Sequence, residues 1–249
     1  MLVFDLDDTL LRNDKTISEY TISVLKKCRS RGIKVVYATG RGNALRVVPQ
    51  ELFDGYVRNG GAVAIADSTK VYEKLVSVEK AREFLLKCDS AGLKIGAQDE
   101  MKHYSNFNVN EIWSWITDYT IVDFTKLDII VEKIYAMPER KQDLEIIEKN
   151  LPDWLTLITA RDKLAMIMHR EASKSKAVNV LAEYWKIETS EIMAFGDDLN
   201  DVDLLEYSGV GVAMGNALDE VKAVADNICD TNENDGAAKW IEEHVLYGN

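Results

Sequence analysis

Both ends of the chain alternate short apolar runs with helical stripes, and this alternation restricts the fold more than any other feature. Near the N-terminus, the apolar run Leu2–Phe4 is followed by a stripe over residues 17–28 and by a second apolar run over 34–38. A strand, a helix and a strand within about forty residues predict a βαβ unit with parallel strands. We expect capping-box spacing at Thr16–Glu19 to begin the helix and Gly32 to end it.

The C-terminal third repeats the same alternation. We expect a helix over 173–186, a strand over 192–195, a short helix over 202–207, a strand over 210–213 and a helix over 217–225. Consecutive βαβ units add parallel strands to one sheet, with helices on both faces. The two ends of the chain therefore predict a single α/β core, a doubly wound parallel sheet of Rossmann-like form.

The middle of the chain differs, because its strands are not followed by the Gly-Asp loops found at the two ends. Its patterns predict helices over 79–91, over 110–119 and from Pro138 to Pro152, and strands over 93–98, 129–137, 155–160 and 164–168. We therefore predict a discontinuous core, residues 1–77 and 170–249, with an inserted α+β domain at 78–169.

Acidic residues follow the first apolar strand directly: Asp5, Asp7 and Asp8. Carboxylates gathered at a strand end repel one another, whereas the carboxyl ends of parallel strands are where ligands bind. Because side chains alternate along an extended chain, we expect Asp5 and Asp7 to point to the same side. Taken alone, this segment fits a solvated acidic turn equally well.

Two further polar elements begin or end core elements. Thr39 and Gly40 follow the second strand, where a hydroxyl and an accessible N–H could bind an oxyanion, although Thr-Gly is also a common turn. Ser173 is suited to cap the helix that Lys174 begins. A lysine in a first helical turn is unfavourable for the helix dipole, so a requirement to neutralise phosphate would explain Lys174.

A second acidic cluster follows the strand over 192–195 and contains Asp197, Asp198, Asn200 and Asp201. An acid-rich helix start explains one or two of these acids but not the whole set. Three carboxylates and an amide within five residues at a strand end are unfavourable unless a cation neutralises them. The cluster therefore indicates a cation site.

Together, these four elements resemble the haloacid dehalogenase superfamily, which carries DxDxT, Thr/Ser, Lys and GDxxND in this order. The matching segments are Asp5–Thr9, Thr39, Lys174 and Gly196–Asp201. Asn59–Ala62, Ser173–Lys174 and Gly211–Ala217 resemble the Cof-type branch, subclass IIB. The resemblance spans the whole chain and is weakest in the insertion.

The resemblance implies a Mg²⁺-dependent phosphatase that forms an aspartyl-phosphate. Asp5 would be the nucleophile and Asp7 the general acid and base. The phosphoryl oxygens would be bound by Thr39, the Gly40 N–H, Lys174 and Asn200. Mg²⁺ would be held by Asp5, the backbone carbonyl of Asp7 and Asp197, with Asp201 supporting from nearby.

The insertion is expected to act as a cap over the site, which favours a small phosphorylated metabolite such as a sugar phosphate. His103 and Tyr104 are candidates for lining the substrate pocket from the cap. A phosphomutase or phosphotransferase would use the same aspartyl-phosphate and stays open as an alternative. A non-enzymatic, receiver-type phosphoacceptor is a more remote one, since such domains are about half this length and have no insertion.

Composition excludes other classes of function. The chain has 42 acidic and 30 basic residues and a net charge of −12, which argues against nucleic-acid binding. Its three cysteines are scattered, so we expect neither a disulfide framework nor a thiolate zinc site. Neither a signal peptide nor a membrane-spanning stretch is evident, so we expect a cytoplasmic protein with no membrane contact. The oligomeric state is not predicted.

Overall fold

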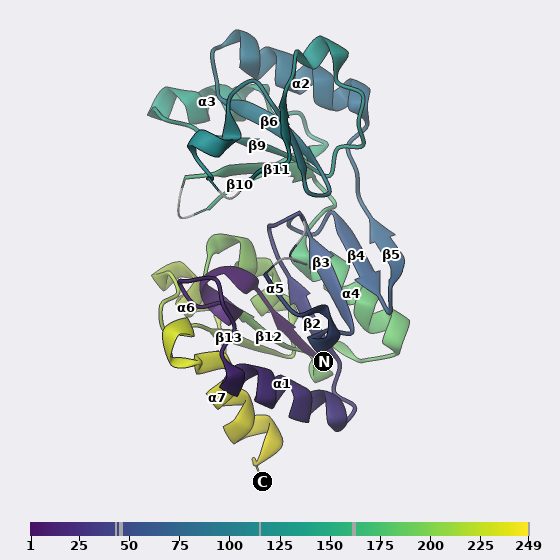
Figure 1. Ribbon diagram of the computed structural model, residues 1–249, viewed down its shortest axis with the longest axis vertical. Coiled ribbons are helices and arrows are strands. Elements are labelled where there is room, and N and C mark those ends of the chain that lie inside the picture. The colour runs from purple at the N-terminus through teal and green to yellow at the C-terminus, as the bar shows by residue number, and fades with distance from the viewer. Residues whose placement is uncertain (43, 45–46, 115, 161–162, 249) are drawn as a thin grey trace.

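In the computed structural model, which describes residues 1–42, 44, 47–114, 116–160 and 163–248, both ends of the chain contribute to one eight-stranded sheet (Figure 1). Its order is β14-β13-β12-β1-β2-β3-β4-β5. The strands are β1 Leu2–Phe4, β2 Val35–Ala38, β3 Gly55–Arg58, β4 Val63–Ala66, β5 Thr69–Glu73, β12 Met193–Gly196, β13 Val210–Ala213 and β14 Asn227–Ile228. Strands β14 to β3 are parallel, while β4 and β5 are antiparallel additions. The predicted parallel α/β core is confirmed.

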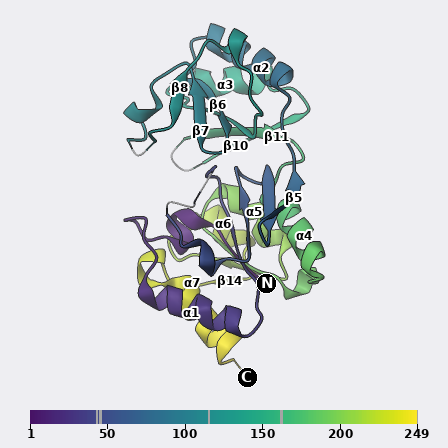
Figure 2. The same ribbon diagram turned by 45° about the vertical axis from the view of Figure 1, so that its right-hand side comes forward.

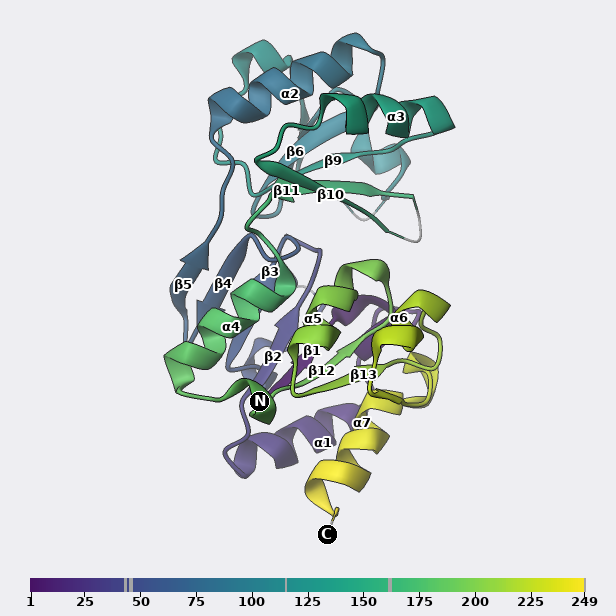
Figure 3. The same ribbon diagram turned by 180° about the vertical axis from the view of Figure 1, so that it is seen from behind.

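Helices cover both faces of this sheet (Figures 1 and 3). The principal helices are α1 Glu19–Ser30, α4 Lys174–Trp185, α5 Val202–Tyr207, α6 Asp219–Val224 and α7 Gly236–Ile241. On one face α1 packs against α7, and on the other α5 packs against α4 and α6. The central strand β1 is buried along its whole length between them. Such burial explains why the strands of the core are uninterrupted apolar runs.

Two predicted helix starts can be compared with the observed caps. Ser173 caps α4 as expected, and its side chain accepts a hydrogen bond from the Lys176 N–H at 3.2 Å. The capping box predicted from Thr16 is wrong, because Ser18 caps α1 by accepting from the Thr21 N–H at 3.0 Å. The side chain of Thr16 instead bonds to Asp14, within the preceding turn.

A second sheet, of six strands within the described residues, lies above the carboxyl ends of the core strands (Figures 1 and 2). Its order is β10-β11-β9-β6-β7-β8, and the strands are β6 Ile95–Asp99, β7 Lys102–Ser105, β8 Tyr119–Ile121, β9 Lys133–Ala136, β10 Leu155–Thr159 and β11 Ala165–His169. Helices α2 Val78–Ser90 and α3 Lys141–Asn150 cover its outer face. We call this sheet and its helices the cap.

Two helices predicted in the cap differ from those observed. The described residues of this segment, 110–114 and 116–119, do not form the predicted helix: a 3₁₀ turn spans Val109–Glu111 and β8 begins at Tyr119. Local hydrogen bonds explain the difference, because the Asn110 side chain donates to the backbone carbonyls of Ser114 and Ile116. The third helix begins at Lys141 rather than Pro138, because the Asp143 carboxylate accepts from the N–H groups of Glu139 and Arg140 before it.

The core and the cap have separate apolar interiors. One cluster of buried residues gathers side chains from 1–66 and 177–246, and the other gathers side chains from 76–167. Two connections join them, one after β5 and one after β11 (Figure 2). The division at 77/78 and 169/170 stays a prediction, but the two interiors establish that the cap packs around its own residues.

Candidate active site

Asp5 is the first residue after β1, and it is buried between β2 and β12. Its backbone N–H continues the ladder by donating to the Phe195 carbonyl at 2.9 Å, and its side chain is 8% exposed. The chain then turns through Leu6–Leu10, where Asp8 has a φ of 59°. Asp5 and Asp7 both line the same cavity, but this turn rather than strand alternation brings them there.

Lys174, the first residue of α4, lies between two buried carboxylates. Its Nζ is 2.6 Å from Asp5 Oδ1 and 2.5 Å from Asp201 Oδ1. The lysine side chain is 1% exposed. Burial alone would lower the pKa of Lys174, but the charges of Asp201 and Asp5 outweigh it and raise that pKa above its ordinary value. The lysine is therefore a fixed positive charge in the interior.

Asp5, Asp197 and Asp201 form the candidate metal centre. Each offers a carboxylate oxygen, and these oxygens lie within 4.8 Å of one another. Asp197 also accepts a hydrogen bond from Thr9 at 2.9 Å. With Lys174 as the neutralising lysine, three carboxylates leave a buried charge of about −2 that a divalent cation would balance. The donor set therefore fits Mg²⁺.

Asp201 differs from the other two acids in its partners. Its second oxygen, Oδ2, accepts from the backbone N–H groups of Asp197 at 3.1 Å and Asp198 at 3.2 Å. Both of its oxygens thus already have donors from the protein. Asp201 orients the loop that carries Asp197 and holds Lys174 in place, which agrees with a supporting position.

Asp7 has partners that sequence reasoning missed. Arg41 binds it with two parallel hydrogen bonds, Nε to Oδ2 and one terminal nitrogen to Oδ1, both 2.6 Å long. Lys15 lies 3.0 Å from Oδ1. Burial would raise the pKa of Asp7, but the bonds from Arg41 and Lys15 prevail and lower it. The only signal for Arg41 in the sequence is its position directly after Thr39 and Gly40.

Thr39, Gly40 and Asn200 lie at the same cavity as the acids. Thr39 is 1% exposed, and its hydroxyl accepts from the Arg41 N–H at 3.1 Å, which shapes the turn after β2. A side-chain carbon placed on Gly40 would lie 3.7 Å from the Asn200 amide nitrogen, so these two residues are close neighbours. The structure therefore brings the site residues that were predicted in the core to one place.

The cavity has a volume of about 840 Å³ and lies between the core and the cap. From the core it is lined by the acids and by the turn after β2. From the cap it is lined by side chains that include Gln98, His103, Trp113, Lys133 and Tyr135. Tyr104 does not line it: this side chain packs against the apolar interior of the cap.

Polar contacts hold the cap against the core. Arg58 and Asn59, at the end of β3, bind the buried carboxylate of Glu132 at 2.7 and 2.6 Å, and we call these three residues the Glu132 cluster. Lys133, next along the cap, donates to the Gly40 carbonyl at 2.6 Å. A side chain on Gly42 would lie 1.7 Å from the Glu100 carbonyl, so glycine is required where the cap turn touches the core.

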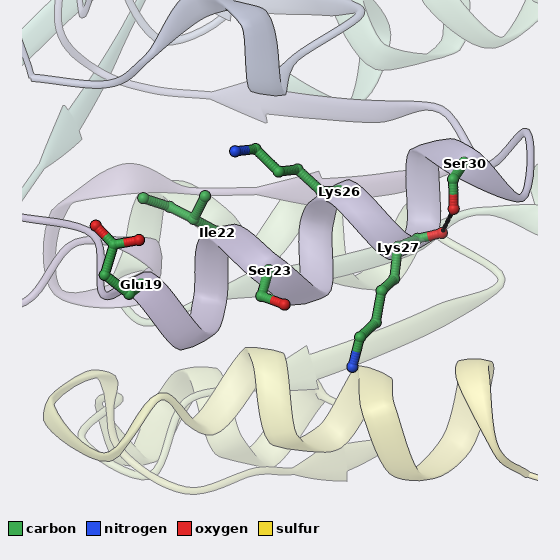
Figure 4. A pocket seen from close by; sticks show the side chains of 6 residues that line it. All are labelled: Glu19, Ile22, Ser23, Lys26, Lys27 and Ser30. Carbon is green, nitrogen blue, oxygen red and sulfur yellow. Dashed lines mark hydrogen bonds between the residues drawn. The ribbon is translucent and has the colours of Figure 1, made fainter.

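A separate hollow lies on the outer side of α1 (Figure 4). All of its lining residues belong to that helix: Glu19, Ile22, Ser23, Lys26, Lys27 and Ser30. Lys27 is paired with Glu242 at 3.0 Å. This hollow shares no residue with the cavity that holds the acids, and its side chains do not suggest catalytic chemistry.

Comparisons with known proteins agree with this geometry. A family model described as haloacid dehalogenase-like hydrolase matches residues 2–241. A 5-amino-6-(5-phospho-D-ribitylamino)uracil phosphatase of Bacillus subtilis is 29% identical, over 98% of this chain and 97% of that protein. A haloacid dehalogenase-like hydrolase from B. subtilis superimposes with a TM-score of 0.86 at 25% identity, covering 98% of this chain and 99% of that one. A sugar phosphatase of subclass IIB has the same fold, with a TM-score of 0.86 at 24% identity over 97% of both chains.

Within the described residues, no helix has the length and apolar character of a bilayer-spanning segment.

Proposed function

The chain belongs to the haloacid dehalogenase-like hydrolases, and we propose that it is a Mg²⁺-dependent phosphatase that hydrolyses small phosphomonoesters through an aspartyl-phosphate on Asp5. One observation carries the proposal. The Asp5 carboxylate is held by Lys174 beside Asp197 and Asp201, and it opens into a cavity that also contains Asp7. Nucleophile, cation site and candidate acid are thus in contact with one substrate space.

In the first half-reaction, Asp5 attacks phosphorus and the alcohol leaves. Lys174 keeps the carboxylate oriented, and Thr39, the Gly40 N–H and Asn200 bind the phosphoryl oxygens. Asp7 protonates the leaving oxygen. For this step one oxygen of Asp7 leaves Arg41 and carries a proton, while Arg41 retains the other oxygen. Asp7 gives this proton to the leaving oxygen and regains one from water in the second half-reaction.

In the second half-reaction, Asp7 accepts a proton from water, and that water attacks the phosphorus of the aspartyl-phosphate. Asp5 is released as a carboxylate and inorganic phosphate leaves. Splitting the transfer into two displacements replaces one difficult step by two easier ones. The same residues serve both steps, since the water enters from the side on which the alcohol departed.

The cation would be held by Asp5, the backbone carbonyl of Asp7 and Asp197, with Asp201 in support. When bound, Mg²⁺ neutralises negative charge on the phosphoryl group during transfer. The buried excess of carboxylates over lysine supports this assignment.

Two alternatives share part of this site. A phosphomutase or phosphotransferase would pass the phosphoryl group from Asp5 to a second alcohol instead of water. A receiver-type phosphoacceptor would need no acid near the leaving group, whereas Asp7 lies in the cavity of this protein. The phosphoacceptor site of such a domain would also not be covered by a cap. The hydrolase description of the family favours water as the acceptor.

The substrate is proposed to be a small metabolite, because the cap closes over the acids and limits the size of the leaving group. A sugar phosphate or a related compound fits this description. Relatives act on both kinds: one is named a sugar phosphatase and another a ribitylamino-uracil phosphatase.

The test is an assay of phosphate release from a panel of phosphorylated metabolites with Mg²⁺, using the native chain and Asp5→Asn. Asn has the same shape but is a far weaker nucleophile, so turnover should vanish while the fold is retained. Turnover by Asp5→Asn at the native rate would contradict the proposal. Transfer to an added alcohol in preference to water would identify a phosphotransferase.

A further inference from the structure

The cap sheet presents one face to the cavity, and its register defines which side chains lie there. Gln98 on β6 is paired with His103 on β7 and with Lys133 on β9. Tyr135, two residues further along β9, is paired with Met166 on β11. We call these five side chains the roof. Residues on the other face, such as Ala97, Tyr104 and Ile134, pack against the interior of the cap.

Aromatic rings occupy the centre of the roof. Tyr135 lies across β6 at Gly96, where a side-chain carbon would be 2.5 Å from the Tyr135 hydroxyl, so glycine makes room for the ring. His103 and Trp113 meet Tyr135 edge to face, with ring centroids 5.2 and 5.9 Å from it. This part of the cavity therefore offers flat, rigid surfaces against which a ring can pack.

The surroundings of these rings are mostly apolar. Met101, Ile116, Leu164 and Met166 also line the cavity. An open-chain polyol placed here would lose water from hydroxyl groups that apolar walls cannot satisfy, which costs free energy. An aromatic ring loses few hydrogen bonds to water when it moves into the same place, because its faces are apolar.

Three buried polar atoms of the roof lack a hydrogen-bond partner within the described part of the chain. Gln98 is 4% exposed and its amide nitrogen donates to the Glu100 carbonyl, which leaves Oε1 as a free acceptor. The other two atoms are Nδ1 of His103 and the hydroxyl oxygen of Tyr135. Burial lowers the pKa of His103 to about 4, so the ring is neutral near pH 7. A buried acceptor without a donor is unfavourable, and a ligand N–H would remove that cost.

The roof has one charged side chain, and that side chain is bound to the core. Lys133 is its cation, and its ammonium donates to the Gly40 carbonyl of the core. A neutral His103 and a neutral Gln98 flank it. The roof thus combines flat apolar surface with acceptors for N–H groups. Its charges give no reason to expect a charged ring in the ligand.

We propose that the preferred substrates are phosphomonoesters whose alcohol carries an uncharged planar heterocycle with N–H donors, and that the heterocycle packs against His103, Trp113 and Tyr135 with an N–H directed to Gln98. This inference rests on the proposed function and specifies its substrate class. The phosphoryl group lies at Asp5, and a short chain spans the cavity to the roof.

Matched substrates test the inference, since they differ only in the ring. Riboflavin 5′-phosphate is compared with D-ribitol 5-phosphate, and uridine 5′-phosphate with D-ribose 5-phosphate, all with Mg²⁺. We expect kcat/KM to be about tenfold or more higher for the ring-bearing ester in at least one pair. Equal or higher values for the ring-free ester in both pairs would overturn the inference.

Acetyl phosphate separates this failure from failure of the proposed function. It carries the transferable group and no ring. If it is hydrolysed while neither ring-bearing ester is preferred, only the substrate class is wrong. If neither it nor any of the four esters is hydrolysed, the proposed function itself fails.

Variants of the roof identify the source of the preference. Gln98→Met keeps the length of the side chain and removes its acceptor, and it should lower the ratio of kcat/KM within the preferred pair by about threefold or more. His103→Phe keeps a ring and removes both nitrogens, and it should lower the same ratio. Tyr104→Phe, on the opposite face of β7, is the matched control and should leave the ratio unchanged. A ratio that Gln98→Met and His103→Phe both leave unchanged would contradict the role of the roof.

Discussion

Among single residues, Lys174 has the most exacting position, because its ammonium contacts Asp5 and Asp201 in the interior at 2.6 and 2.5 Å. A buried ion cluster of this kind adds little net stability, since desolvation offsets the attraction. Removing one member is different, because the remaining charges are left buried without compensation. The site therefore depends on Lys174 for its charge balance as well as for phosphate binding.

Lys174→Met should lower the free energy of unfolding by about 3–5 kcal/mol in EDTA, because the Asp5 and Asp201 carboxylates lose their cation. Added Mg²⁺ should recover more stability in this variant than in the native chain. Urea unfolding with and without Mg²⁺ measures both effects. Lys176→Met is the control, since Lys176 is paired with Glu171 at the surface and should change stability by less than about 1 kcal/mol. Equal effects of the two substitutions would contradict the account.

Some of these residues could be found from the sequence and others could not. Asp5, Thr39, Lys174 and the acids from Asp197 onward follow strands or begin a helix, so their local pattern predicts a common location. The contact between Arg41 and Asp7 depends on how two loops meet, which no local pattern reveals. Their roles in catalysis stay predictions until variants are tested.

At the scale of elements, two buried polar features affect the stability of the cap. The Glu132 cluster joins the cap to the core, and His103 is a buried titratable group of the cap sheet. Helix and strand periodicity predicted most of the cap strands but failed at residues 110–119, where the side chain of Asn110 binds nearby carbonyls. The roof was also missed, apart from His103, because Gln98, Lys133 and Tyr135 lie in short strands with no motif. Only the register of three strands places them together.

Glu132→Gln should weaken the contact between cap and core, since Arg58 loses its buried carboxylate. We expect a loss of about 1–3 kcal/mol in unfolding free energy. Glu100→Gln is the matched control, because the Glu100 carboxylate binds the same arginine but is 64% exposed, so its loss should cost less than about 1 kcal/mol. Chemical unfolding measures both variants, and a larger loss for Glu100→Gln would rule out the Glu132 cluster as the main contact.

His103 should make cap stability depend on pH. The pKa of His103 is lowered by burial, and further by Lys133, from 6.5 to about 4. Between these values the unfolded chain binds a proton that the folded chain does not, so stability is full above pH 6.5 and falls as the pH drops to 4. The total contribution is on the order of 3 kcal/mol. His103→Phe should flatten the dependence of Tm on pH in this interval, and an unchanged slope would contradict it.

At the scale of the whole molecule, the core supplies the chemistry and the cap supplies the cover. Alternating apolar runs predicted the parallel sheet, because buried parallel strands have a composition that a local window can recognise. Strands β3, β4, β5 and β14, which extend the sheet at its two edges, were not predicted. How the cap meets the core depends on side chains far apart in the sequence, such as Lys133 and Gly40.

Removal of divalent cations should abolish turnover without unfolding the protein. Mg²⁺ should restore activity after EDTA treatment, whereas Ca²⁺ should restore it poorly, because Ca²⁺ takes more ligands at longer distances and disturbs the alignment of Asp5 with phosphorus. Circular dichroism in EDTA checks that the fold persists. Full activity in excess chelator would exclude the metal site at Asp5, Asp197 and Asp201.

The central claim is that Asp5 carries the phosphoryl group, and trapping that intermediate tests it most directly. Tritiated borohydride reduces an acyl phosphate to an alcohol, so quenching the enzyme during turnover should convert Asp5 to labelled homoserine. We predict label in the peptide that contains Asp5 only when a phosphomonoester and Mg²⁺ are present, and none in Asp5→Asn. Steady turnover with no label at Asp5, or with label at another residue, would contradict the account.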